Sequence, residues 1–245
     1  MRATAALGLA AIVLVLGPAP AAAQSSAWTD AGYATISGFY QTSTSFSDLA
    51  RPIQFGEAAQ VDTRYGLTGM PGLDAGAGVR VWRNLALGVD VAFLSKAGGG
   101  SIAAQMPHPF YFNRPRAVAG DASGLTRAET AVNVEALVML PLRARWQAAV
   151  FGGPTWFRVE QDLVTAVTLT ETYPFDAAVF AGTTSARQSR SKAGFNVGGD
   201  LSYMIRPRVG VGVDVRFSRA RIAITDTATI TAGGPHVGGG LRLRF

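Results

Sequence analysis

The sequence predicts an all-β fold: an eight-stranded antiparallel up-and-down β-barrel that crosses a membrane with its strands. Three observations predict it. Segments in which apolar and polar residues alternate recur along the 245-residue chain, and such alternation puts each set of side chains on one face of a strand. Short and long connections join these segments in turn. The chain also begins with an apolar run that ends in small residues, which is typical of exported proteins.

The first 23 residues have the form of a cleaved export signal. Met1 and Arg2 precede the apolar run, and three alanines that end at Ala23 provide a small-residue cleavage site. The run is too short for a membrane-spanning helix, which needs about 20 apolar residues. We expect cleavage after Ala23 and one barrel domain over residues 24–245. The chain has no cysteine, so we expect no disulfide, lipid-attachment cysteine or thiolate metal site.

Six segments show the alternation clearly. They cover residues 73–82, 85–93, 132–140, 195–205, 209–218 and 236–245. With a rise of ~3.3 Å per residue and a tilt near ~40°, each apolar face covers roughly 20 Å along the barrel axis, close to the ~25 Å apolar band of transmembrane barrels. Each of these segments is therefore long enough to cross a membrane as a strand.

Residues 33–44 and 145–157 complete an even number of strands, although their faces are less distinct. The side chains that we expect to face lipid are Ala34, Ile36 and Tyr40 in the first segment and Trp146, Ala148 and Val150 in the second. With this choice, Phe39, Phe151 and Phe157 lie on the opposite faces of the two segments.

The connections are unequal on the two sides of the predicted barrel. Three are short and three are long, and a fourth on the long side is of moderate length. Short periplasmic turns and long extracellular loops are characteristic of outer-membrane barrels. The short connections are 83–84, 141–144 and 206–208, and the longer ones are 46–71, 97–127, 161–189 and 222–233.

The polar faces carry acids and arginines in nearly equal number, beside many glycines. A soluble lipocalin-like barrel would instead have a polar outside and an apolar cavity, and a solvent-facing surface would not need so much glycine. Because an unpaired buried charge costs several kcal/mol, we expect most of these groups to be paired inside a narrow lumen. The predicted luminal charge network consists of Arg80, Asp90, Glu135, Asp200, Asp214, Arg216, Arg242 and Arg244.

Over nearly all of the mature chain, the pattern resembles the small eight-stranded bacterial outer-membrane barrels of the OmpA/OmpX/OmpW kind. The most specific element is the last strand, whose apolar face ends in Leu241, Leu243 and Phe245. This ending is similar to the C-terminal signal that the barrel assembly machinery reads in that family. The resemblance implies a place in the outer membrane, assembly by that machinery, and contact with outer-membrane lipids and lipopolysaccharide.

Two functions are compatible with such a barrel. The first is a structural or surface-interaction role with a closed lumen, because eight strands enclose little more than their own side chains. In this case the aromatic segment of loop 97–127 either packs on the barrel rim or forms a contact site for lipopolysaccharide phosphates, an extracellular ligand or a host surface. The alternative is a narrow channel or conduit for a small or hydrophobic solute, since the inward glycines leave space. The candidate contact residues are Phe110, Tyr111, Phe112, Arg114 and Arg116.

An enzyme that modifies lipid A or cleaves peptides is disfavoured. His108 lies between two prolines, and the next residue on the same face as His236 is Gly238 rather than a serine nucleophile. The sequence shows no pair of aspartates beside a histidine. We expect no metal or organic cofactor, and the run 98–101 is interpreted as a flexible loop. The modest excess of 22 basic over 16 acidic residues is scattered, so no nucleic acid partner is expected.

Overall fold

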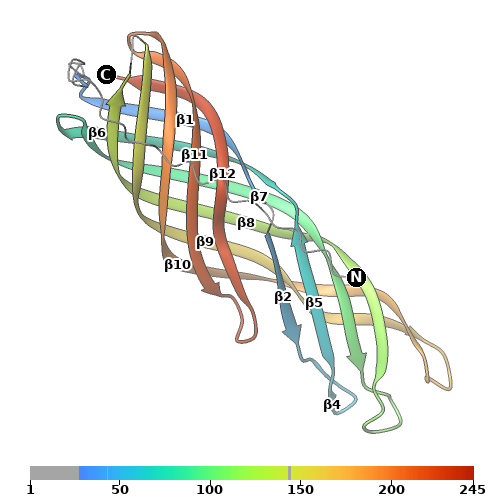
Figure 1. Cartoon of the computed structure of the whole chain (residues 1–245). Coiled ribbons are helices and arrows are strands. Elements are labelled where there is room, and N and C mark those ends of the chain that lie inside the picture. The colour runs from blue at the N-terminus through green and yellow to red at the C-terminus, as the bar shows by residue number, and fades with distance from the viewer. Residues whose placement is uncertain (1–27, 43, 143–144) are drawn as a thin grey trace, which may run out of the picture.

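The computed structural model describes residues 28–42, 44–142 and 145–245, and its strands form a closed antiparallel ring (Figure 1). Each ring strand pairs with the next, and the last pairs with the first. The predicted eight-stranded up-and-down barrel is confirmed. The ring consists of β1 (Gly32–Gln41), β6 (Met70–Trp82), β7 (Leu85–Met106), β8 (Arg116–Pro141), β9 (Trp146–Glu171), β10 (Ala178–Arg206), β11 (Val209–Ala223) and β12 (Thr229–Arg244).

Part of the chain that the sequence analysis covers lies outside the described residues. This applies to the expected export signal at 1–23 and to positions 143–144 of a predicted turn. Within the described ranges, no helix is long and apolar enough to cross a membrane.

The ring closes where β12 runs antiparallel to β1, from the pair Tyr33 and Arg244 to the pair Gln41 and His236. Close approach of the two backbones requires glycine in this seam. A Cβ atom built on Gly240 would lie 2.0 Å from the Ile36 carbonyl oxygen. The glycines of the last strand therefore serve strand pairing as well as luminal space.

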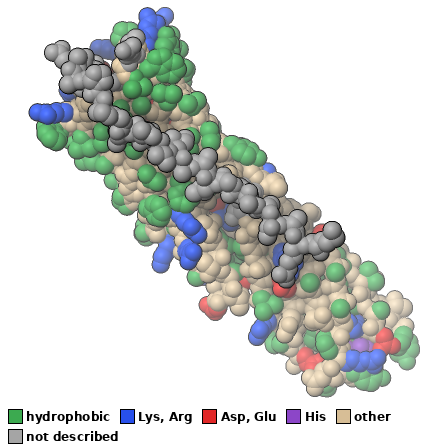
Figure 2. All heavy atoms as spheres, in the orientation of Figure 1, with side chains coloured by type: hydrophobic (Ala, Val, Ile, Leu, Met, Phe, Trp, Pro, Cys, Tyr) green, Lys and Arg blue, Asp and Glu red, His purple; other side chains and the backbone are tan. Residues whose placement is uncertain are grey.

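The outer face of the ring is apolar in the half that contains the short turns, here called the turn end. Val91 and Val213 are 44% and 57% exposed, and Figure 2 shows hydrophobic side chains spread over the wall of this half. Both less distinct strands face as predicted, because Ile36 and Val150 point outward whereas Phe39 is buried. Paired aromatic rings border the apolar region, Trp146 with Tyr203 and Phe195 with Phe217.

Four strands are far longer than predicted. β7, β8, β9 and β10 contain 22 to 29 residues, so most of the predicted loops 97–127 and 161–189 are strand. The actual connections are 107–115 and 172–177. The glycine run at 98–101 lies within β7, and its interpretation as a flexible loop was wrong. Figure 1 shows the long hairpins projecting beyond the ring, at what we call the distal end.

The physical reason for this error is that the two strand faces exchange character along the chain. In β11, the outward residues are apolar as far as Phe217 and are then Arg219 and Arg221. The inward residues are glycine or charged as far as Arg216 and are apolar by Ile222. The wall is therefore suited to lipid at the turn end and to water at the distal end.

The distal end has its own apolar core inside the extended strands. Shorter strands complete this part: β2 (Thr44–Ala50), β3 (Ile53–Gln54), β4 (Glu57–Ala58) and β5 (Gln60–Leu67). Tyr65 stacks on Phe46 and accepts a hydrogen bond of 2.8 Å from the Val164 amide. Burial raises the pKa of Tyr65. Members of this distal core include Val61, Ile102, Met106, Val118, Leu125, Phe157, Val159, Ile222 and Ile230.

The wall of the distal end includes an unpaired strand edge on β10. β10 pairs with β11 only from Phe195 toward the turn end, so residues 178–194 pair with β9 alone. Exposed basic side chains, among them Arg190 and Lys192, mark this free stretch, and such charges disfavour pairing with a foreign strand. The Arg187 guanidinium, which donates a hydrogen bond of 3.0 Å to Asp162, lowers the pKa of that carboxyl.

Candidate functional sites in the lumen and at the distal tip

Arg216 lies at the centre of the luminal charges. Its guanidinium forms ion pairs with Asp90 and, at 3.2 Å, with Glu135. The same group lies 5.0 Å from the centre of the Phe151 ring, within the range of a cation–π contact. All three charged side chains are buried, so one arginine on β11 is shared between carboxylates from β7 and β8.

Arg242 forms a second centre nearer the seam. It donates hydrogen bonds of 2.7 Å to Asp200 and 2.9 Å to Asp214, and a third of 2.7 Å to Ser37. A Cβ atom on Gly212 would lie 2.9 Å from Arg242 Nε. Glycine at position 212 thus makes room for this guanidinium.

Arg80 and Arg244 occupy inward positions, but neither forms an ion pair within the described part of the chain. Arg80 is half-buried and donates a hydrogen bond of 2.5 Å to the Trp28 carbonyl oxygen. Arg244 lies 5.7 Å from the Trp28 ring centre and 3.6 Å from Met139 Sδ. These two arginines therefore hold Trp28, which precedes β1 at the turn end, instead of pairing with acids as expected.

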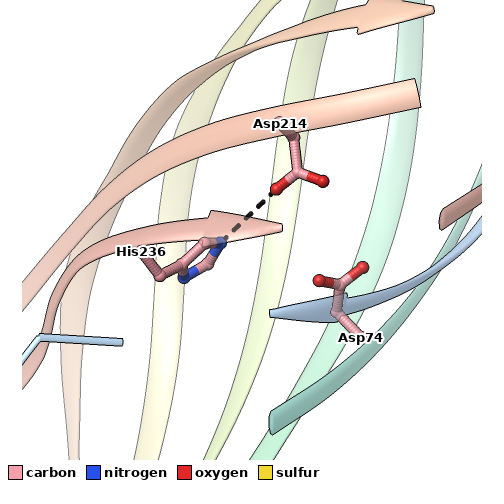
Figure 3. A group of neighbouring side chains, drawn as sticks. All are labelled: Asp74, Asp214 and His236. Carbon is pink, nitrogen blue, oxygen red and sulfur yellow. Dashed lines mark ion pairs between the residues drawn. The ribbon is translucent and has the colours of Figure 1, made fainter. Parts of the chain in front are cut away.

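Asp74, Asp214 and His236 come together in the lumen from β6, β11 and β12 (Figure 3). One ligand-type atom from each lies within 4.8 Å of the others, and all three residues are buried. This group does not stand out in the sequence, where no pair of aspartates has a histidine nearby. The three positions are distant in sequence, so only the closed ring brings them together. Among the described residues, Asp74, Asp214 and His236 form one group of three side chains whose donor atoms lie close enough together to hold a metal ion.

The lumen is filled on both sides of the charges. A cavity of about 50 Å³ lies among them, which is enough for a few water molecules, and a second of about 20 Å³ lies beside His236. An apolar cluster that includes Trp28, Tyr33 and Phe151 closes the turn end. The distal core closes the other side.

A buried ion pair that the sequence analysis missed separates the charges from the distal core. Arg127 Nε donates a hydrogen bond of 2.7 Å to Glu129, and Arg127 Nη2 donates one of 2.6 Å to the Thr231 carbonyl oxygen. Arg127 is fully buried. Its inward register could have been recognised if the alternation had been followed through the predicted loop.

The candidate contact residues lie at the distal tip, in the connection 107–115. Phe110, Tyr111 and Phe112 are 65%, 56% and 74% exposed. Arg114 lies over the Tyr111 ring and pairs with Asp176 of the neighbouring connection at 3.3 Å. The aromatic side chains of this segment are thus largely exposed, while Phe110 packs edge-on against Phe175 of the neighbouring connection and Tyr111 against His108.

Arg116 is a support of the tip and is not accessible for contact. Its side chain is buried, pairs with Glu171 at 2.6 Å and donates hydrogen bonds to the carbonyl oxygens of Pro107 and Phe175. His108 is also buried, and its Nδ1 accepts hydrogen bonds from the amides of Phe110 and Tyr111. These contacts tie two connections into one rigid tip.

Replacing Arg116 by methionine is expected to loosen the tip without unfolding the ring. The change removes both carbonyl contacts and leaves Glu171 without its ion-pair partner, and such local losses increase local opening. We expect chymotrypsin to cleave at the exposed aromatic residues about tenfold faster. Mass spectrometry of the fragments measures this rate, and Arg190→Met is the control with an exposed arginine. Equal cleavage of both variants would show that Arg116 does not hold the tip.

Comparisons with known proteins show a resemblance in fold. No protein-family model matches the chain, and no curated protein matches its sequence. Neisserial surface protein A is 12% identical with a TM-score of 0.48, and the match covers 87% of this chain and 97% of that one. OprG of Pseudomonas aeruginosa is 9% identical with a TM-score of 0.46, and the match covers 88% and 96%. Both are small eight-stranded outer-membrane barrels, the kind that the sequence resembles.

The outer membrane protease OmpT of Escherichia coli is also similar, with 10% identity, a TM-score of 0.48 and coverage of 90% and 98%. Similarities at this level carry no argument about activity. The ring of paired strands and its apolar outer wall identify the fold.

Proposed function

We propose that this chain is an outer-membrane surface protein, in which a closed barrel anchors a rigid distal extension that makes contact through its tip. The observation that carries the proposal is the exposure of three consecutive aromatic side chains, Phe110, Tyr111 and Phe112, on a tip that buried groups hold in place. Contiguous exposed apolar groups commonly mark interaction sites. A fixed backbone reduces the entropy that a partner must overcome.

The form of the lumen supports anchoring rather than transport. Arg216 joins two carboxylates across the interior, Arg242 joins two more from the neighbouring strands β10 and β11, and apolar clusters lie on both sides of them. A solute would have to displace these clusters and separate buried ion pairs. The proposal places the turn end in the periplasm, with Leu241, Leu243 and Phe245 facing lipid as the signal for the barrel assembly machinery.

The distal end also provides space for a ligand. A cleft of about 470 Å³ lies beside the tip between Glu57, Gln60, Gln105 and Asn113. The Asn113 amide donates a hydrogen bond of 2.9 Å to Glu57, which joins the connection 107–115 to the β3–β4 segment. The aromatic tip and this polar cleft together suit a partner with both apolar and polar surface, such as lipopolysaccharide or an extracellular macromolecule.

Adhesion of cells that display the protein tests the proposed role. We expect the triple variant Phe110→Ser, Tyr111→Ser, Phe112→Ser to reduce attachment to polystyrene beads by about threefold or more, because it removes the exposed aromatic contact area. Arg190→Ser with Lys192→Ser is the matched control, since it changes exposed side chains of β10 away from the tip. The proposal fails if the triple variant adheres like the unaltered protein.

Planar-bilayer recording tests the alternative of a narrow channel. The purified barrel is expected to show no regular single-channel steps, while its gel mobility still shifts on heating as for a folded barrel. Reproducible conductance steps in the unaltered protein would instead favour a conduit for a small solute.

A further inference from the structure

We propose that Asp74, Asp214 and His236 form a binding site for one divalent transition-metal ion inside the barrel. The site lies away from the tip, so it is independent of the proposed surface role. Figure 3 shows the three side chains pointing toward one another from three different strands. The proposal departs from the expectation that the chain needs no metal.

Asp74 lies in a part of the lumen that is short of cations. This aspartate is 6% exposed, and no described residue donates a hydrogen bond to it or lies within ion-pair distance of it. Arg216 and Arg242 already face four other carboxylates. Asp74 is a fifth, and a buried carboxylate without a partner is strongly unfavourable. A divalent cation beside it would offset the surplus negative charge.

His236 carries a buried ring nitrogen without a hydrogen-bond partner among the described residues. This side chain is 4% exposed, and its Nε2 lies 3.7 Å from Asp214 Oδ2. That separation is longer than a hydrogen bond, and Nε2 has no hydrogen-bond partner among the described residues. The imidazole ring stacks on Phe39 with ring centres 4.5 Å apart. Packing therefore holds the ring with a free ligand atom directed at the carboxylates.

The two carboxylate oxygens of Asp214 face different partners, so one can be held by an arginine while the other binds a metal ion. Its Oδ1 accepts a hydrogen bond of 2.9 Å from Arg242, whereas Oδ2 faces His236. An arginine that donates a hydrogen bond to one oxygen of a ligating carboxylate fixes the orientation of the other oxygen. Gly238 supplies the space, because a Cβ atom there would lie 2.9 Å from Asp214 Oδ1.

The donor set indicates the class of metal. Two carboxylates and one imidazole suit Zn²⁺ and related first-row ions, and three protein ligands leave a position for water. Water has space in the cavity of about 50 Å³ that Asp74 and Asp214 line. The ligand atoms lie within 4.8 Å of one another, so a small inward movement of the side chains brings them to bonding distances of about 2.0–2.2 Å.

Metal titration of the untagged full-length protein, purified in detergent and stripped with a chelator, tests the site. We expect one Zn²⁺ per chain by calorimetry, and an absorption spectrum of a low-symmetry site when Co²⁺ is the probe. Asp74→Asn and His236→Gln should each weaken Zn²⁺ binding by at least about tenfold. Asp121→Asn is the matched control, since it removes an exposed carboxylate elsewhere and should leave binding unchanged.

A stability measurement keeps the test decisive if a variant folds poorly. Without metal, Asp74→Asn should be at least as stable as the unaltered protein, because it removes an unpaired buried charge. With Zn²⁺ the unaltered protein should gain stability and Asp74→Asn should gain none. The proposal is overturned if the unaltered protein binds none of Zn²⁺, Co²⁺, Ni²⁺ and Mn²⁺ at one ion per chain. Binding that survives in both Asp74→Asn and His236→Gln overturns it as well.

Discussion

Arg216→Met is expected to lower the free energy of unfolding by about 3–5 kcal/mol, the cost of breaking a buried ion pair from one side. The variant removes the guanidinium that faces both Asp90 and Glu135 and leaves two buried carboxylates in its place. The apolar length of methionine keeps most of the contact with the Phe151 ring, so the loss reports charge rather than volume. Urea unfolding in lipid vesicles, followed by tryptophan fluorescence, measures the change.

Two further variants distinguish the loss of the buried ion pairs from the mere loss of one positive charge. Arg219→Met changes an exposed arginine on the same strand and should alter stability by less than about 1 kcal/mol. Adding Asp90→Asn and Glu135→Gln to Arg216→Met should recover most of the loss, because neither former partner of Arg216 then carries a charge. If Arg216→Met is as stable as Arg219→Met, the luminal ion pairs do not hold the barrel together.

Val213→Lys is expected to cost about 2–4 kcal/mol, the penalty for lysine on the lipid face near the middle of a bilayer. Val213 is 57% exposed and lies at the centre of the apolar outward face of β11. In water the same exposure would make this substitution nearly neutral. The measurement therefore tests directly whether this wall faces lipid.

Ala223→Lys is the matched control on the same face of the same strand. Ala223 lies beyond Arg219 and Arg221, where the outward residues have become polar, so lysine there should cost less than about 1 kcal/mol. Refolding into vesicles at increasing urea concentration gives both values. Equal costs at positions 213 and 223 would place the membrane boundary elsewhere on the wall.

The part of the fold that the sequence predicted best is the turn end. There, strict alternation in β7, β11 and β12 reports local contact with two different surroundings, lipid and lumen. The strand count and the closing pairing of β12 with β1 followed from it, whereas the inward direction of Phe39 was predicted from a strand with less distinct faces. The luminal positions of Asp90, Glu135 and Arg216 could be predicted in the same way, because the side of the wall that a side chain faces depends only on its place in the alternation.

The distal end was not predictable in the same way. Ile102 and Met106 continue the inward register of Asp90, but they are apolar where Asp90 is charged. If outward residues are required to be apolar, as in a membrane-spanning strand, residues 97–106 do not fit a strand and are predicted to be a loop. The same reasoning treated Arg116 as a contact residue, although it is buried against Glu171. Here the interior is packed protein, so its character follows from neighbouring strands rather than from lipid.

The alternation along the chain thus specifies the strands, their facing and the apolar wall, because each depends on the surroundings of a single strand. Partners across the lumen depend on ring closure. Asp74 meets Asp214 and His236, and Arg244 packs on Trp28, because tilt and stagger bring together positions far apart in sequence. No periodicity within one strand contains that information, since these contacts are made across an interior that exists only once the barrel has closed.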